Sequence, residues 1–132
     1  MPTPRRAAFI EDNEKHPMLG KMITGLGRAF GALQLATAHI ASKGMGDPEE
    51  AGAAATEYLR LFGLVALGYM WARTAKLSLE KMMGAGSDAA FYQTKLQTAR
   101  FYFERILPQA GGLLFQIKAG KEAMMSFPEA AF

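Results

Sequence analysis

The amino-acid sequence predicts an all-α fold, specifically an up-down antiparallel four-helix bundle. Val occurs once and Ile five times in 132 residues, so the β-branched residues that favour strands are scarce. Four segments repeat apolar residues every three or four positions, which is the period of a helix with one buried face. The segments are joined by short connections, and short connections favour antiparallel neighbours.

The first helix is expected over about residues 17–42, after a flexible N-terminal arm at residues 1–15. Residues 16–132 are expected to form a single helical domain. An apolar stripe along this helix would face the core, and it consists of Leu19, Ile23, Leu26, Phe30, Leu33, Thr37 and Ile40.

The second helix is expected over residues 48–83. Asp47 is a suitable N-cap and Pro48 a suitable first helical residue, with Glu49 and Glu50 near the positive end of the helix dipole. Its core stripe would be Tyr58, Leu61, Val65, Gly68, Ala72, Ala75 and Leu79. Between Leu61 and Ala72 apolar residues cover every face, which predicts a helix surrounded on all sides. Within this stretch we therefore expect four residues to be largely buried, namely Leu64, Val65, Gly68 and Trp71.

The third and fourth helices are expected over residues 89–107 and 113–125. Ser87 or Asp88 would cap the third helix. Pro108 and the Gly111–Gly112 pair would separate the two helices. The third would bury Tyr92, Leu96, Ala99, Phe103 and Ile106, and the fourth would align Leu113, Ile117, Gly120 and Met124.

Composition and charge exclude several classes of function. The net charge is +3, and Arg5 and Arg6 in the arm supply two of these units, so no basic face typical of a nucleic-acid-binding protein is indicated. The longest charge-free apolar run has twelve residues between Arg60 and Arg73, whereas a membrane span needs about 18 or more. The absence of Cys excludes disulfides and thiolate chemistry, and it fits a cytoplasmic location.

No catalytic, cofactor-binding or metal-binding residue can be assigned from the sequence. His16 and His39 have no metal-ligand spacing, and no nucleophile or dinucleotide motif occurs. The acidic pairs Glu11–Asp12 and Glu49–Glu50 lie at expected helix starts, where they suit capping better than acid–base catalysis. We therefore expect no catalytic activity from this chain alone.

Two stretches, YLRLFGLVALGYMWAR at residues 58–73 and FYQTKLQTARFYFERILP at residues 91–108, resemble a known family. The family is the acetyl-CoA dehydrogenase C-terminal-like domain, which follows the flavin-binding core of long bacterial acyl-CoA dehydrogenases. The resemblance extends over residues 45–132 and more weakly over residues 15–45. It implies a parent enzyme in which FAD and a carboxylate base on the preceding domains oxidise an acyl-CoA. The chain would then be either a fragment of such an enzyme or a free-standing descendant of its last domain.

Two functions from different classes follow. The first is a non-catalytic accessory domain whose partner is the dehydrogenase core or a second copy of itself. Its interface candidates are Trp71, Tyr102, Phe101 and Phe115, and the last two lie opposite the core stripes of their helices at 100° per residue. A twofold dimer is the simplest self-association. The alternative is a membrane-surface or lipid-contacting module, for which the expected basic face opposite an apolar face is approached only by the first helix.

Overall fold

The computed structural model describes residues 4–13, 16, 19–84 and 88–132, and in these residues all regular structure is helical. The expected all-α fold is therefore confirmed. The elements are α1 (Pro4–Asn13), α2 (Gly20–Gly44), α3 (Pro48–Gly84), α4 (Ala89–Phe101), the π-helical turn η1 (Tyr102–Ile106), α5 (Gln109–Lys118), α6 (Glu122–Met125) and the 3₁₀ turn η2 (Glu129–Ala131).

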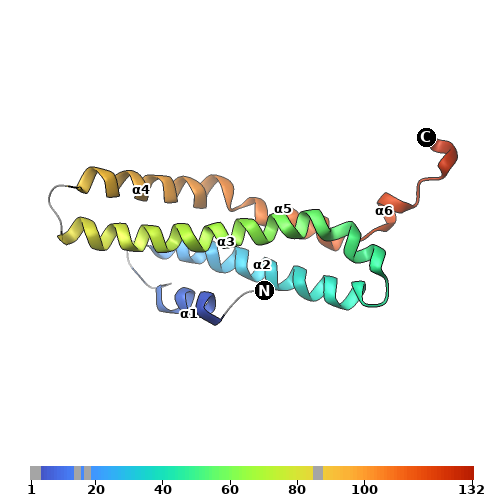
Figure 1. Cartoon of the computed structure of the whole chain (residues 1–132), viewed down its shortest axis with the longest axis horizontal. Coiled ribbons are helices and arrows are strands. Elements are labelled where there is room, and N and C mark those ends of the chain that lie inside the picture. Colours follow the sequence, from blue (N-terminus) through green and yellow to red (C-terminus); the bar gives the residue numbers. More distant parts are fainter. Residues whose placement is uncertain (1–3, 14–15, 17–18, 85–87) are drawn as a thin grey trace.

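The long helices form three antiparallel arms (Figure 1). α2 and α3 run in opposite directions, and α4, η1 and α5 then follow one another back along α3. The up-down four-helix arrangement is thus not confirmed, because α4 and α5 run in the same direction. α3 is the central element, with α4 against one half of its length and α5 against the other.

Pro108 bends the third arm without ending it. A proline inside a helix has no N–H to donate, and its ring collides with the carbonyl four residues earlier. The chain widens to a π-turn just before this point, where the Leu107 N–H donates to the Tyr102 carbonyl over 2.9 Å. The proline then precedes the first residue of α5. The expected break at Gly111–Gly112 is wrong, since both glycines lie inside α5.

The core lies where α2, α3 and the third arm converge. Their shared feature is a run of side chains that are almost fully buried, including Leu19, Ile23, Leu26, Leu33, Leu61, Val65 and Ile117. Gly68 permits a close approach within this core: a Cβ there would lie 3.2 Å from Leu26 Cδ1 and 3.4 Å from Leu107 Cδ1. The predicted core stripes of the first two helices are thus largely confirmed, with Thr37, Ile40, Tyr58 and Leu79 partly buried at their ends.

Asp47, in the turn between α2 and α3, caps α3 as the sequence predicts. The Glu49 N–H donates to Asp47 Oδ1 over 3.2 Å, which caps the first turn of α3. At the start of α4, Asp88 makes no such side-chain hydrogen bond, and Ser87 lies outside the described residues.

Within the segment expected to be a flexible arm, residues 4–13 are described by the structure. Pro4–Asn13 form α1, and the Phe9 ring packs edge-on against Tyr69 of α3 with centroids 5.3 Å apart. Asn13 is buried, and its Nδ2 donates to the Phe9 carbonyl over 2.8 Å. α1 is therefore attached to the bundle by aromatic contact, and the domain boundary at residue 16 stays a prediction.

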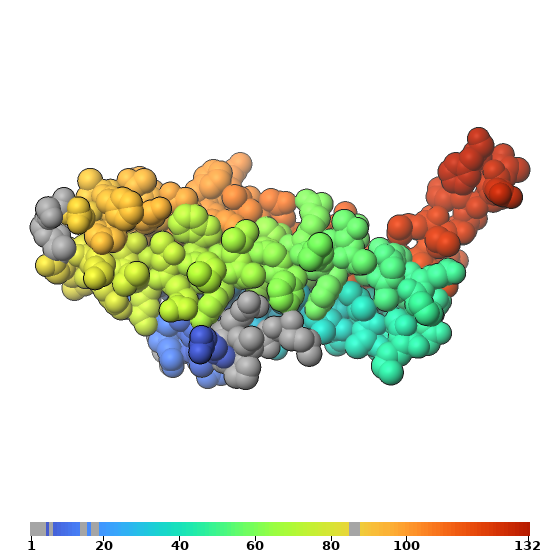
Figure 2. Space-filling model, in the orientation of Figure 1, coloured from blue at the N-terminus to red at the C-terminus, as the bar shows by residue number. Residues whose placement is uncertain are grey.

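The C-terminal region also differs from the expectation. The fourth helix was expected to continue to Met125, but α5 ends at Lys118 and Gly120 takes a φ of +80°, a conformation that favours glycine. Met124, expected on the core stripe, is 61% exposed. Residues 122–132 leave the body of the molecule as a projecting segment (Figures 1 and 2).

Candidate functional site

An apolar stripe on the outer face of α3 is the first candidate docking surface. Leu67, Met70 and Leu77 are 55%, 55% and 53% exposed. With Gly63 and Thr74 they recur at spacings of four, three, four and three residues, which places them on one side of the helix. We call these five residues the outer stripe. Such spacing is typical of a helix surface that packs against another helix.

The outer stripe corrects the expectation that α3 has no solvent-facing side between Leu61 and Ala72. Val65 and Gly68 are buried as predicted, whereas Leu64 and Trp71 are only partly buried. Leu67 and Met70 are exposed because α2, α4 and α5 contact other sides of α3. The other helices of this chain therefore leave some of the apolar side chains of α3 exposed.

The four interface candidates fall into three environments. Phe101 and Phe115 are 57% and 78% exposed on α4 and α5, so both are available to a partner. Trp71 packs partly against the core. Tyr102 is buried, and its hydroxyl donates to the Leu64 carbonyl of α3 over 2.5 Å. Tyr102 is therefore a core residue instead of a surface contact, and the docking role of the other three stays a prediction.

A groove of about 770 Å³ lies between the N-terminal half of α2 and the η1–α5 segment. Two cations on α2, Lys21 and Arg28, line it together with Thr24, and among the described residues no acidic side chain does so. The remaining lining consists of small or apolar residues, namely Gly20, Gly25, Ala29, Ala32, Phe103, Leu107, Pro108, Ala110 and Gly111. We call this the basic groove. The sequence alone did not predict this groove, because its other wall is created by the bend at Pro108.

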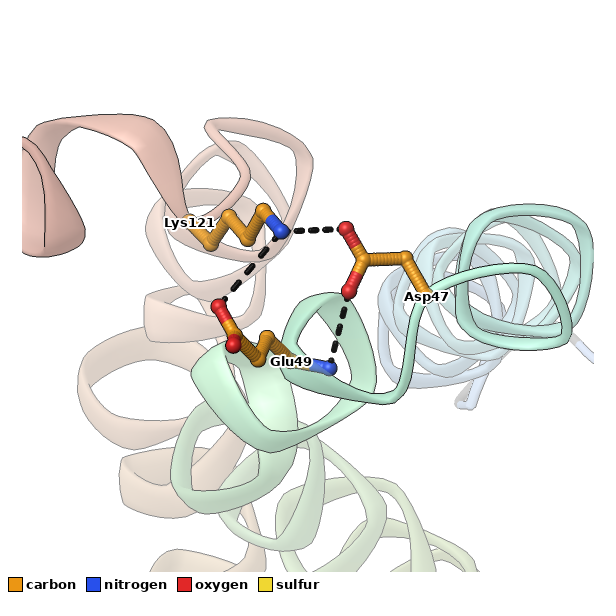
Figure 3. Close-up of polar contacts among 3 residues, drawn as sticks. All are labelled: Asp47, Glu49 and Lys121. Atoms are coloured by element: carbon orange, nitrogen blue, oxygen red, sulfur yellow. Dashed lines mark hydrogen bonds and ion pairs between the residues drawn. The ribbon is translucent and has the colours of Figure 1, made fainter.

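An ion-pair cluster ties the α2–α3 turn to the start of the projecting segment (Figure 3). Lys121 Nζ donates to Asp47 Oδ2 and lies 3.5 Å from Glu49 Oε2. The hydrogen bond with Lys121 lowers the pKa of Asp47, and the same bond raises the pKa of Lys121. The cluster is partly exposed, and its one lysine is paired with two carboxylates from the α2–α3 turn and the start of α3, so it holds these segments together.

The described residues contain few features associated with chemistry. Among them, no three His, Asp or Glu side chains are grouped as metal ligands. Burial raises the pKa of Tyr102 to about 12, and its hydroxyl is already used within the core. None of the helices in the described parts of the chain is long and apolar enough to span a bilayer. The main candidate functional features of the described residues are thus two surfaces, the outer stripe and the basic groove.

Comparison with known proteins identifies the family. The sequence model described as "Acetyl-CoA dehydrogenase C-terminal like" matches residues 5–128. The chain belongs to this family. The match includes α1 and α2, so it extends further towards the N-terminus than the resemblance that is visible in residues 45–132.

The chain is also similar to part of a much longer curated protein. The chain is 32% identical over 81 residues to "Butyryl-CoA dehydrogenase" of Syntrophomonas wolfei subsp. wolfei (strain DSM 2245B / Goettingen). The alignment covers 59% of this chain and 13% of the relative. The chain therefore corresponds to a small part of that dehydrogenase.

Proposed function

We propose that this chain is a non-catalytic accessory domain that docks on the core domains of an FAD-dependent acyl-CoA dehydrogenase in the cytoplasm and supports their assembly. Family membership and the butyryl-CoA dehydrogenase relative support the choice of partner. The relative's catalytic residues and flavin would lie in the large part of the enzyme that this chain does not match. The contribution of this domain would be binding surface and rigidity.

The observation that carries the proposal is the outer stripe of α3. Three large apolar side chains at helix-packing spacing are each more than half exposed. Soluble proteins tolerate single exposed apolar residues, whereas a contiguous patch is typical of an interaction site. Burial of apolar surface on docking would supply the favourable free energy, at about 25 cal/mol per Å² before the cost of association.

The proposal is tested by binding to a dehydrogenase core. The probe is the S. wolfei butyryl-CoA dehydrogenase lacking the segment that this chain matches, mixed with the wild-type chain and followed by sedimentation velocity. The wild type is expected to co-sediment with the core. A Leu67→Glu, Met70→Glu double variant places two charges on the outer stripe and is expected to weaken binding by at least about tenfold, or 1.4 kcal/mol.

Leu35→Glu is the matched control. Leu35 is 58% exposed and lies on α2, a different helix from the outer stripe, so the substitution has the same chemistry at a similar exposure. It is expected to bind like the wild type. Loss of binding in this control equal to the loss in the stripe variant, or no binding by the wild type, would refute docking through α3.

A further inference from the structure

The projecting segment, residues 122–132, exposes large apolar side chains along its length. Met124, Met125 and Phe127 are each about 60% exposed, and Phe132 is 94% exposed. The Phe127 and Phe132 rings lie against each other, with centroids 5.9 Å apart. The segment also carries Glu122 and Glu129 and no Lys or Arg, so it is both apolar and acidic.

The direction of this segment is fixed at its base. Gly120 turns the chain with its positive φ, and Lys121 is held by Asp47 and Glu49 at the α2–α3 turn. The segment therefore starts beside the C-terminal end of α2 and points away from the bundle (Figure 1). The basic groove starts at Gly20, near the opposite end of α2, about 36 Å away at 1.5 Å per residue.

The basic groove has the complementary character. Lys21 and Arg28 are separated by seven residues, or about 10 Å along a helix, and none of the acidic side chains that the structure describes lines the groove beside them. Gly111 leaves an open approach, since a Cβ at this position would meet nothing within 4 Å. Phe115 lies one helical turn beyond Gly111 on the same side of α5, and its ring is exposed.

We propose that the projecting segment of one copy of this chain occupies the basic groove of a second copy. Glu122 and Glu129 give the segment two negative charges, and Lys21 and Arg28 give the groove two positive charges, so opposite charges would meet. The apolar residues between the two glutamates would cover the small-residue floor and the Phe115 ring. Because the segment and the groove are different surfaces, reciprocal exchange between two copies closes a twofold dimer.

A second copy fits these observations better than the chain's own segment does. To enter its own groove the segment would have to reverse direction at Lys121, against the ion-pair cluster and the turn at Gly120 that direct it outwards. In a dimer the segment keeps its outward course. This interface uses a surface separate from the outer stripe of α3, so it is independent of docking on a dehydrogenase core.

The steric test uses two neighbouring glycines of α5. Gly111→Leu places a side chain in the groove. Gly112→Leu is the control, because its side chain points 100° further around the helix and Gly112 does not line the groove. A Cβ at either position meets nothing within 4 Å. Sedimentation equilibrium on the full chain is expected to show that the wild type and Gly112→Leu dimerise. The dimer dissociation constant of Gly111→Leu is expected to be at least about tenfold higher. A wild type that stays monomeric, or equal effects of the two substitutions, would overturn the proposal.

The charge test identifies the occupant. Lys21→Glu with Arg28→Glu and, separately, Glu122→Lys with Glu129→Lys are each expected to weaken dimerisation about tenfold. All four substitutions in one chain are expected to restore it, and failure of this rescue would contradict the pairing. Phe115→Ser is expected to weaken the dimer, whereas Phe101→Ser and the outer-stripe variant leave it unchanged.

The absence of Cys permits a direct check for contact between copies. One sample is labelled with a donor fluorophore at Ala131→Cys, in the projecting segment, and another with an acceptor at Gln109→Cys, beside the groove. Energy transfer that appears on mixing and rises with concentration is expected. No transfer in the mixture would show that the segment does not enter the groove of a second copy.

Discussion

Tyr102 offers the sharpest test of how the third arm is held to α3. Its ring is 5% exposed, and its hydroxyl donates to the Leu64 carbonyl over 2.5 Å. Tyr102→Phe removes this hydroxyl and keeps the ring. The Leu64 carbonyl lies within α3, where the Gly68 N–H remains a partner for it, so the substitution leaves no unsatisfied acceptor. The expected loss of stability near neutral pH is about 1 kcal/mol, the net value of one hydrogen bond.

The effect of this substitution should depend on pH. Burial raises the pKa of Tyr102 from 10.0 to about 12. A group whose pKa is higher in the folded state stabilises the fold fully below its unfolded pKa, and this contribution is lost as the pH rises towards the folded pKa. By about pH 11 the wild type should have lost about 1.4 kcal/mol from this group, while Tyr102→Phe loses nothing from it.

The assay is urea unfolding of both proteins, followed by far-UV circular dichroism, at about pH 7 and about pH 11. The wild type is expected to be more stable than Tyr102→Phe at the lower pH, and its advantage is expected to vanish at the higher pH. Comparison of the two proteins at each pH removes the effects of the other titrating groups. A difference that is the same at both pH values would refute the account of Tyr102 as a buried donor.

Three further predictions concern packing and cofactor content. Gly68→Val adds methyl groups against Leu26 and Leu107 and should destabilise the fold by about 1–3 kcal/mol, measured by the same unfolding assay; an unchanged stability would contradict close packing at Gly68. Trp71→Ala should lower the free energy of unfolding by about 2–3 kcal/mol. This is at or below the low end of the range for a fully buried Trp, because Trp71 is only partly buried. A loss of stability near zero would show that Trp71 is not part of the core. The purified chain is expected to carry no flavin, and stoichiometric flavin absorbance in the visible range would overturn its assignment as non-catalytic.

Local sequence signals predicted the first two long helices closely. The structure has α3 at Pro48–Gly84, one residue longer than predicted. The cap at Asp47 and Pro48 and the apolar stripe from Leu61 each involve residues that are close together in the sequence. These signals are capping and periodicity, and they depend little on the rest of the chain. The ion pair between Arg100 and Glu104 is local in the same way, since the two residues are four positions apart and lie 2.9 Å from each other.

The sequence did not predict features that depend on tertiary packing. The bend at Pro108 is accommodated by the π-turn, which lets the third arm continue and changes the expected bundle. Residues 4–13 form the helix α1, which was not predicted, and its Phe9 ring packs against Tyr69, 60 positions later in the sequence. The exposure of Leu67 and Met70 depends on which sides of α3 the other helices cover, and periodicity alone does not specify this.

Radical footprinting of the methionines in α3 and its flanking turn tests the docking proposal most directly. Met70 lies on the outer stripe and is 55% exposed, while Met45 and Met83 are about 90% exposed near the two ends of α3. When the chain is bound to the truncated butyryl-CoA dehydrogenase, oxidation of Met70 is expected to fall several-fold and oxidation of Met45 and Met83 to stay unchanged. Equal oxidation of Met70 in the free chain and in the complex would contradict docking through the outer stripe.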